Sequence, residues 1–319
     1  MRFEGEPTFL VCGEALFDMF VRSDEDGKVW LDAVPGGSPF NVAFGLARLG
    51  QRVEFFSGLS EDLMGRKLAR FMNSEEVGLS FAKYTSGPTA LSIVELNEEG
   101  SPDYAFYGHL PAYQTLTENE LPVLPETIRV IHVGSIATVL QPTAGALESL
   151  AERECGARLI AYDPNIRPTI EPDLDVWRRA LGRLSAAAHL IKVSAEDLAL
   201  LFPGAAHDEI VGRWLGGTTQ LVVVTEGAKG AVAWNRLGKL HCPQEPVEAV
   251  DTVGAGDSFQ SALLAGLAEL DLLDANALGD ISERNLLRLL QFAGAAAAQT
   301  CSRQGADLPY REAIPIRFG

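Results

Sequence analysis

Short apolar runs alternate with longer amphipathic segments through most of the chain. The apolar runs are typical of buried strands and lie at residues 8–12, 53–57, 90–96, 130–133, 158–162, 190–193 and 221–225. Amphipathic segments with helical spacing predict helices at residues 39–49, 65–73, 142–152, 175–184, 195–201, 258–270 and 282–301. From residue 128 strands and helices alternate, and residues 230–241 predict a hairpin. The pattern indicates an α/β fold, a doubly wound and mostly parallel sheet flanked by helices.

Two segments, at about residues 14–35 and 88–113, do not follow this alternation. They contain short apolar stretches separated by polar turns, and residues 104–107 would pair with the strand at residues 90–96 across a turn at residues 97–101. Such segments either decorate the main sheet or form a small β-sheet of their own. Because the chain has no internal repeat, we treat residues 1–319 as one domain.

The charge balance narrows the classes of partner. The chain has 26 basic and 43 acidic residues and a net charge of -17, so we expect neither nucleic acid nor a membrane surface as a partner. No apolar run approaches the ~20 residues of a membrane span and no signal peptide is visible, so a cytoplasmic location is expected. The four cysteines form no Cys-x-x-Cys and the five histidines lack zinc-ligand spacing, so we predict neither a disulfide framework nor structural zinc.

The strongest candidate for a functional site is the stretch Asp251-Thr-Val-Gly-Ala-Gly-Asp-Ser-Phe259. Gly254 and Gly256 lie just before the helix at residues 258–270. Glycines let the backbone turn tightly and approach a ligand, and the first turn of a helix presents free N–H groups and a partial positive charge. This combination predicts an anion pocket, usually for phosphate. Asp257 would repel phosphate there, so it either caps the helix or has a chemical task of its own.

Two stretches resemble the signatures of the ribokinase-like (PfkB) carbohydrate kinases. One is residues 251–259, and the other is Gly-Gly-Ser-Pro-Phe-Asn-Val-Ala at residues 36–43. The resemblance extends over about residues 9–310 and implies a ribokinase-like fold with a small β-sheet lid over a sugar. It implies that Asp257 is the base for a sugar hydroxyl. It implies an anion hole made by the amides of Gly254, Ala255 and Gly256, and sugar contacts from Asp18, Gly36, Gly37, Asn41 and Phe106.

Some of these residues also have simpler interpretations. Asp18 would otherwise be a solvated loop residue, and Asn41 would cap its own helix. Ser38 is predicted to be the N-cap of the helix at residues 39–49, with Pro39 at the first helical position.

Arg167 lies in Asp163-Pro-Asn-Ile-Arg167, which resembles the loop of fructokinases and ketodeoxygluconate kinases. The resemblance implies that Arg167 reaches the sugar and the transferred phosphoryl group, which suits its forked cation. The alternative is a surface arginine that pairs with Glu171 or Asp173.

The family resemblance also implies sites for ATP and for cations. Glu196 lies where the family has an acid tied to Mg²⁺, which we expect to act through water, although Ser194 replaces the usual asparagine and Glu196 could be an ordinary helix-start acid. The carbonyls around Asp251 and Val253 resemble a monovalent cation loop, which would bind K⁺. ATP contacts are implied for Lys192, Thr225, Gly227, Gly230, Gly254, Gly256 and Ala297, with a mostly apolar adenine pocket at residues 294–298.

These features together predict an ATP-dependent sugar kinase, most like a bacterial fructokinase. The alternatives are a 2-keto-3-deoxygluconate kinase, a sugar-binding regulator without turnover, and a dinucleotide-dependent dehydrogenase, which the absence of a third fingerprint glycine disfavours. The P-loop motif and the Gly-x-Ser-x-Gly motif are absent. An exposed lid edge would permit a homodimer.

Overall fold

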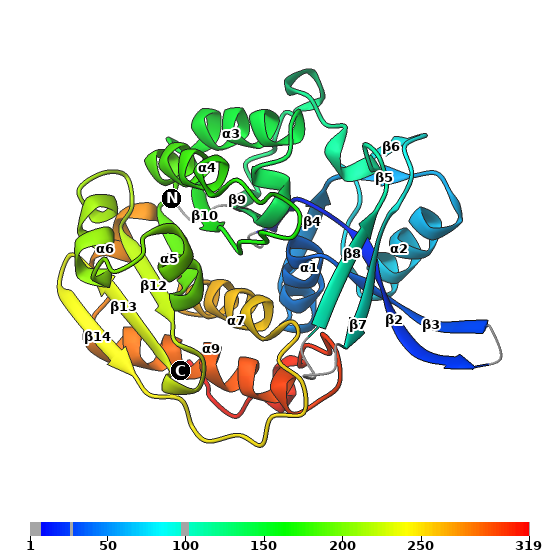
Figure 1. The fold of residues 1–319 in the computed structure, drawn as a ribbon. Helices are drawn as coiled ribbons and strands as arrows, with labels where there is room; N and C mark the ends of the chain where they lie inside the picture. Colours follow the sequence, from blue (N-terminus) through cyan, green and yellow to red (C-terminus); the bar gives the residue numbers. More distant parts are fainter. Residues whose placement is uncertain (1–7, 26–27, 97–101, 319) are drawn as a thin grey trace.

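A large sheet covered by helices on both faces forms most of the computed structural model, which describes residues 8–25, 28–96 and 102–318 (Figure 1). The strand order is β14-β13-β12-β11-β10-β9-β1-β4. The strands from β12 to β4 run parallel, and β13 and β14 add an antiparallel edge. The bounds are β1 Thr8–Cys12, β4 Arg52–Phe56, β9 Ile128–Gly134, β10 Leu159–Asp163, β11 Leu190–Ser194, β12 Leu221–Thr225, β13 Ala231–Asn235 and β14 Gly238–Cys242. The structure therefore confirms the predicted mostly parallel sheet and the hairpin at its edge.

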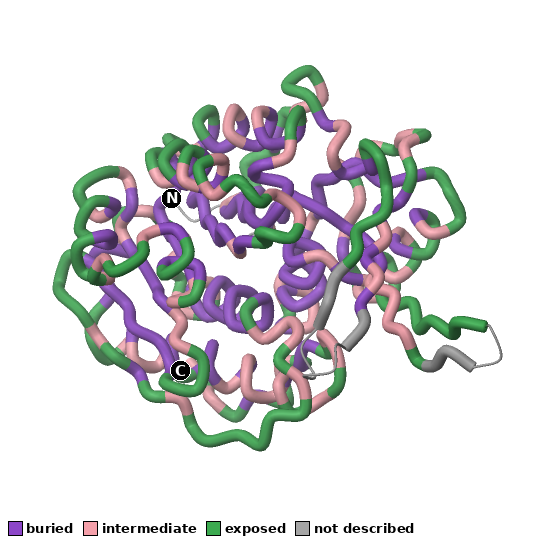
Figure 2. Tube along the Cα trace, in the orientation of Figure 1, coloured by how far each residue is buried: buried purple, intermediate pink, exposed green. Residues whose placement is uncertain are grey.

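Alternate residues of the parallel strands enter two separate hydrophobic cores. Phe9 and Val11 of β1 belong to the core shared with α1, α7 and α9, whereas Leu10 and Cys12 belong to the core shared with α3, α4, α5 and α6. The trace of the central strands and of α7 is buried (Figure 2). The helices are α1 Ser38–Arg48, α2 Leu63–Ser74, α3 Thr143–Glu154, α4 Leu174–Ala187, α5 Ala195–Leu201, α6 His207–Leu215, α7 Ala255–Glu269, α8 Ala275–Gly279 and α9 Glu283–Cys301.

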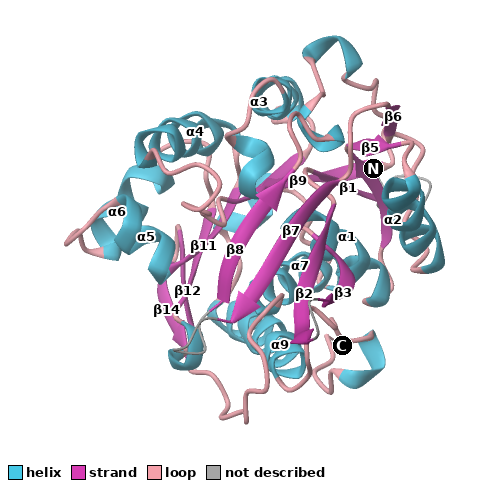
Figure 3. Cartoon of the chain, turned by 45° about the vertical axis from the view of Figure 1, so that its right-hand side comes forward, coloured by secondary structure: helices cyan, strands magenta, loops and turns pink. Residues whose placement is uncertain are grey.

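The two segments that break the alternation form a separate sheet, which we call the lid sheet. It consists of β2 Leu16–Glu25, β3 Lys28–Gly36, β7 Ala90–Leu96 and β8 Pro102–Tyr107 in the order β3-β2-β7-β8 (Figure 3). The strands β7 and β8 pair antiparallel as predicted, but their turn at residues 97–101 lies outside the described residues. The outer ends of β2 and β3 extend away from the large sheet (Figure 1).

Several short elements were not predicted. They are β5 Gly58–Ser60 and β6 Lys83–Thr85, which form a two-stranded parallel sheet, and the helices α6 and α8. In α6 only Ile210, Val211 and Trp214 are buried, so its apolar face is too sparse to dominate the pattern. No helix in the described part of the chain is both long and apolar enough to cross a membrane.

The carboxyl ends of β1, β9, β10, β11 and β12 lie at one edge of the large sheet because these strands are parallel. The lid sheet starts directly after β1 and returns to α1 through Gly36 and Gly37. In open α/β sheets this edge is where ligands bind, so the lid sheet and the predicted site residues share one end of the molecule.

Candidate active site

The N-terminus of α7 forms the centre of the site. Gly254 is the N-cap and has φ 77°, and a Cβ on it would lie 2.7 Å from Cβ of Ala306, so only glycine fits this turn. The helix begins at Ala255, three residues earlier than predicted. The N–H of Ala255 donates to the carbonyl of Thr252 at 3.2 Å. The N–H groups of Gly256 and Asp257 have no partner among the described residues, so these two remain free for an anion.

Asp257 does not cap α7, because Gly254 is the N-cap and no described side chain bonds the first turn of the helix. Its carboxylate accepts hydrogen bonds from the hydroxyl of Ser38 at 2.6 Å and from the side-chain amide of Asn41 at 2.8 Å. The side chain is buried, and burial raises the pKa of Asp257, whereas the bonds from Ser38 and Asn41 and the cation of Lys192 oppose that rise. The acid is therefore held at a fixed place by another helix.

One prediction about α1 needs correction, and one alternative is excluded. Ser38 is not the N-cap, because Gly37 takes that position and the Ser38 hydroxyl donates to Asp257. Asn41 does not cap its own helix either, since its amide donates to Asp257. The oxygen Oδ1 of Asn41 is buried and has no hydrogen-bond partner in the described structure, which leaves an unpaired acceptor on the residue that bonds Asp257.

Asp18 approaches the same place from the lid sheet. It lies on β2 and is half-buried, rather than in a solvated loop. A Cβ on Gly36 would lie 2.4 Å from its Oδ2, so the missing side chain at Gly36 makes room for this carboxylate. Burial raises the pKa of Asp18 to about 6, the Ser92 hydroxyl and the Arg167 cation oppose the rise, and the charge of Asp257 adds to it. Asp18, Asp257 and Arg167 therefore interact across the gap between the two sheets.

Arg167 follows β10 and is exposed. It donates to the carbonyl of Ile166 at 2.9 Å, and its charge lowers the pKa of Asp18. Asp173 lies 3.9 Å from Arg179, and Glu171 accepts a bond from the backbone of Asp173. Neither acid pairs with Arg167 in the described structure, and its predicted contact with the sugar and the phosphoryl group stays a prediction. Phe106 lies on β8 opposite Ser92, which places it on the lid face that carries Asp18.

A buried ion pair lies below the N-terminus of α7. The ammonium of Lys192 on β11 is 2.8 Å from Oδ2 of Asp163, the last residue of β10. A Cβ on Gly256 would lie 3.2 Å from the Lys192 nitrogen. The predicted contact between Lys192 and ATP stays a prediction, and the structure adds that its charge lies under the free amides of the helix.

The predicted nucleotide segment follows β12 at the same edge of the sheet. Thr225 ends the strand, and Gly227 and Gly230 flank a short 3₁₀ turn with φ 56° and 102°. Ala297 is half-buried on α9. The side-chain amide of Gln244 donates to the carbonyl of Gly294 at 3.3 Å. The predicted adenine region is therefore less apolar than expected, because Gln244 comes from a loop that the sequence pattern did not place there.

The predicted Mg²⁺ contact depends on one carboxylate, that of Glu196, and the predicted K⁺ site depends on the loop around Asp251 and Val253. Glu196 is exposed in the first turn of α5, which Ser194 caps by accepting the N–H of Asp197 at 3.0 Å. Across residues 8–25, 28–96 and 102–318, no group of three or more His, Cys, Asp or Glu side chains is arranged to hold a metal ion. The carboxylate of Asp251 accepts from the N–H groups of Val253 at 3.0 Å and Gly305 at 2.8 Å, so it fastens the two loops together. The backbone carbonyls at Asp251 and Val253 stay the predicted ligands of a monovalent cation.

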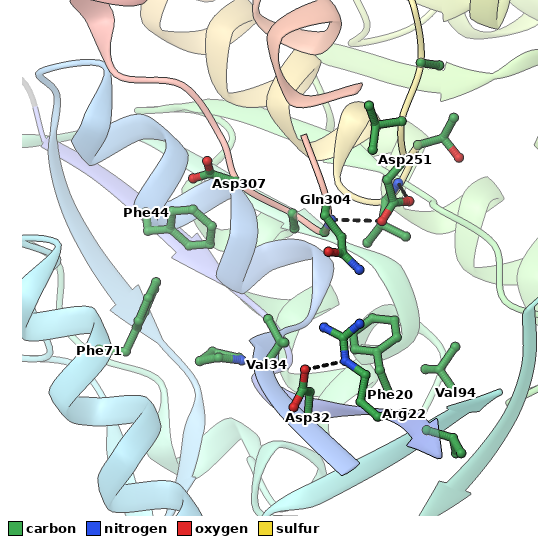
Figure 4. Close-up of a pocket in the computed structure, with 18 of the residues that line it drawn as sticks. Phe20, Arg22, Asp32, Val34, Phe44, Phe71, Val94, Asp251, Gln304 and Asp307 are labelled. Carbon is green, nitrogen blue, oxygen red and sulfur yellow. Dashed lines mark hydrogen bonds and ion pairs between the residues drawn. The ribbon is translucent and has the colours of Figure 1, made fainter. Parts of the chain in front are cut away.

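A cavity of about 830 Å³ lies between the lid sheet, α1, α2 and the loops at residues 249–253 and 304–307 (Figure 4). Figure 4 shows Phe20 and Val34 of the lid sheet facing this cavity, with Asp251 across it. Val34 is opposite Asp18 in the strand register, so the cavity lies under the face of the lid sheet that carries Asp18. Neither Asp18 nor Asp257 lines it. The cavity therefore lies next to the predicted cation loop and under the same face of the lid sheet as Asp18.

The sequence interpretation did not assign four buried or bonded side chains at this site. They are Glu14, Ser38, Asp163 and Asp197. Burial raises the pKa of Glu14 to about 7, and its Oε2 accepts the N–H of Ala137 at 3.3 Å. Asp197 accepts the N–H of Ile166 at 3.2 Å and so supports the loop that carries Arg167. Glu14 and Asp163 could have been found from their position in the sequence, because both lie where strands of the large sheet end.

Comparisons with known proteins identify the family and the fold. A family model described as pfkB family carbohydrate kinase matches residues 13–313. The chain is 35% identical to a fructokinase of Rhizobium leguminosarum bv. trifolii over 277 residues, which cover 87% of this chain and 85% of that protein. Its structure is similar to that of a Xylella fastidiosa fructokinase with bound ATP, with a TM-score of 0.86, 27% identity and coverage of 97% and 95% of the two chains. It is also similar to a Vibrio cholerae O395 fructokinase bound to fructose, ADP and a calcium ion, with a TM-score of 0.81, 25% identity and 94% coverage of each chain.

These matches confirm the ribokinase-like fold and the sequence resemblance. They also exclude the dehydrogenase alternative, because the matched family transfers phosphoryl groups to alcohols. The chain therefore belongs to the pfkB family of carbohydrate kinases and is a phosphotransferase that acts on an alcohol group of a sugar.

Proposed function

We propose that the protein is an ATP-dependent fructokinase, which transfers the γ-phosphoryl group to the primary hydroxyl of fructose and forms fructose 6-phosphate. The observation that carries the proposal is the buried carboxylate of Asp257 beside the free amides of Gly256 and Asp257, with Asp18 facing it from the lid sheet. The 35% identity to a fructokinase supports fructose as the sugar.

The proposed sugar site lies between the lid sheet and α1. Asp18 and the unpaired Oδ1 of Asn41 would accept sugar hydroxyl protons, because a buried hydroxyl needs a partner. Gly36 and Gly37 keep the backbone close to the sugar, and Phe106 would provide an apolar wall. Arg167 would contact both the sugar and the phosphoryl group in transfer.

The proposed nucleotide site starts at the free amides of α7 and extends past Thr225 and Gly227 to Ala297. Mg²⁺ bound with ATP would neutralise phosphate charge, and Glu196 would contact it through water, as a single exposed carboxylate can. The carbonyls at Asp251 and Val253 would bind K⁺.

In the proposed mechanism Asp257 accepts the proton of the attacking hydroxyl. Ser38 bonds one oxygen of its carboxylate and Asn41 bonds the other, so the group keeps one orientation, and the remaining lone pairs of these oxygens would accept the proton. Phosphoryl transfer has a loose transition state, so positioning and charge stabilisation supply most of the catalysis. Closure of the lid sheet over the sugar would exclude water from the phosphoryl group.

The test is the variant Asp257→Asn. General-base catalysis contributes ~10²–10⁴-fold, so we expect kcat to fall by that order while fructose binding measured by calorimetry persists. Glu152→Gln, on the exposed side of α3, is the control and should keep full turnover. Turnover of Asp257→Asn near the wild-type rate would refute the role of Asp257.

The sugar itself is tested by ADP release with fructose, ribose, 2-keto-3-deoxygluconate and adenosine. We expect the highest kcat/KM for fructose. A preference for 2-keto-3-deoxygluconate would assign the protein to the alternative kinase activity, and sugar binding without ADP release would indicate a regulator.

A further inference from the structure

Lys192 and Asp163 form an ion pair with almost no access to water. The ammonium and Oδ2 of the carboxylate are 2.8 Å apart, and the side chains are 5% and 1% exposed. The two residues lie on neighbouring parallel strands, β11 and β10, at the edge of the sheet below α7. A buried ion pair is a weak source of stability, because desolvation offsets most of the attraction. Its position in the site therefore calls for a functional reason.

The pair is in contact with the anion pocket from below. The Lys192 nitrogen lies 3.2 Å from the position that a Cβ on Gly256 would take, so it touches the backbone that presents the free amides. The second oxygen of Asp163, Oδ1, is buried and has no hydrogen-bond partner in the residues described. One positive and one negative charge thus lie beside Asp257 with little screening.

We propose that Lys192 and Asp163 are positioning residues that set the charge state of the Asp257 carboxylate from beneath the helix, with Lys192 favouring the ionised base and Asp163 opposing it. The proposal rests on the proposed role of Asp257 as the base. It adds a task for Lys192 that differs from direct contact with ATP, and it assigns a role to Asp163.

The neighbours of Asp257 support this division of effects. Lys192 lowers the pKa of Asp257 and Asp163 raises it, and the effect of Lys192 is the larger. From α1 only the neutral side chains of Ser38 and Asn41 contact Asp257. Its other charged neighbours are Glu14, after β1, and Asp18, on β2, which faces Arg167. Each of these groups remains in the variants that follow.

The experiment measures the acid limb of the pH dependence of kcat/KM for fructose, which reports the essential acids of the free enzyme, Asp257 and Asp18. Lys192 and Asp163 act on the pKa of Asp257, so a limb that moves in their variants reports Asp257. A charge within ~4–6 Å of a carboxylate shifts its pKa by about one unit or more. Lys192→Met should move the acid limb to higher pH by about that amount, because the ionised base loses its cation. Asp163→Asn should move it to lower pH, because a like charge is removed.

The opposite shifts of the acid limb in the two variants distinguish an effect on the charge of Asp257 from a merely structural effect. Lys192→Arg keeps the charge and should return the acid limb toward the wild-type pH. If Lys192→Met fails to fold, the variant with both Lys192→Met and Asp163→Asn leaves no unpaired charge and should have a limb above the wild type. Limbs that do not move, or that move in the same direction in both single variants, would overturn the proposal.

A role of Lys192 in ATP contact alone gives a different result. Lys192→Met would then raise KM for ATP without moving the acid limb, and Asp163→Asn would leave the limb in place. A failure of the proposed function gives a separate result. Asp257→Asn would then keep its turnover, independently of the pH dependence of the Lys192 and Asp163 variants.

Discussion

At the scale of single residues, the site brings together three carboxyl groups whose burial disfavours their ionised form. Glu14 is buried, Asp18 is half-buried, and both carry raised pKa values, to about 7 and about 6. Asp257 is also buried, and its charge adds to both rises. Perturbed groups of this kind concentrate at functional sites, since a catalytic arrangement is seldom the most stable one.

Replacing Glu14 tests the cost of this charge. The pKa of Glu14 is raised in the folded protein, so the folded state binds the proton more tightly than the unfolded state between about pH 4.5 and pH 7. Its penalty is therefore absent at low pH and grows as pH rises, to about 3 kcal/mol at most.

We expect Glu14→Gln to remove this slope, so that the variant gains stability over the wild type at pH 7 and none at pH 4.5. Denaturant unfolding at both pH values measures the effect, and Glu152→Gln on α3 controls for the loss of one charge. An equal change of stability at the two pH values would contradict the expectation.

Sequence reasoning found the residues that carry a local signal and missed those whose role depends on tertiary contact. Asp257 and Asn41 lie in signature stretches, and the structure joins them by a hydrogen bond. Ser38 looked like a cap because serine before proline at a helix start usually is one. Asp163 and Lys192 are separated by 29 residues, and only the register of β10 and β11 brings them together.

At the scale of elements, two helix starts meet at one carboxylate. Asp257 lies in the first turn of α7, and Ser38 and Asn41 lie in the first turn of α1. Both helix N-termini carry partial positive charge, so this meeting stabilises an anion. The alternation of apolar and polar residues predicted both helices, but it placed the start of α7 at residue 258 because Gly254 and Gly256 resemble a loop.

Substitution of Gly254 tests whether the turn before α7 positions the free amides of that helix. Alanine there would need a left-handed conformation and would clash with Ala306, whereas Gly50 has a similar φ of 80° and open space around it. The strain alone costs about 1 kcal/mol, so Gly50→Ala should lose roughly that much stability and keep its KM for ATP.

Gly254→Ala should lose more stability than Gly50→Ala and raise KM for ATP, because the free amides of α7 shift with the turn. Thermal unfolding and initial-rate kinetics on the two variants measure both effects. Equal loss of stability with unchanged KM in both would show that the turn does not position the amides.

At the scale of the whole molecule, the lid sheet is the part whose existence, but not its form, could be predicted from the sequence. Its strands carry apolar residues on both faces, so periodicity did not resolve β2 and β3 as one long hairpin. One edge strand, β3, exposes Val29 at 58% and Trp30 at 62%, which is unusual for large apolar side chains. Exposed strand edges invite pairing with another chain, which is the physical basis of the expected homodimer.

Trp30→Glu tests that expectation. If β3 pairs with β3 of a second copy, a charge at its most exposed apolar residue should separate the copies, because an unpaired charge would be buried in the interface. We expect the wild-type protein to sediment as a dimer at micromolar concentration and Trp30→Glu to sediment as a monomer. Leu237→Glu, at the turn between β13 and β14 and 63% exposed, is the matched control and should remain a dimer. A wild-type monomer, or a dimer that survives Trp30→Glu, would contradict pairing of two copies through β3.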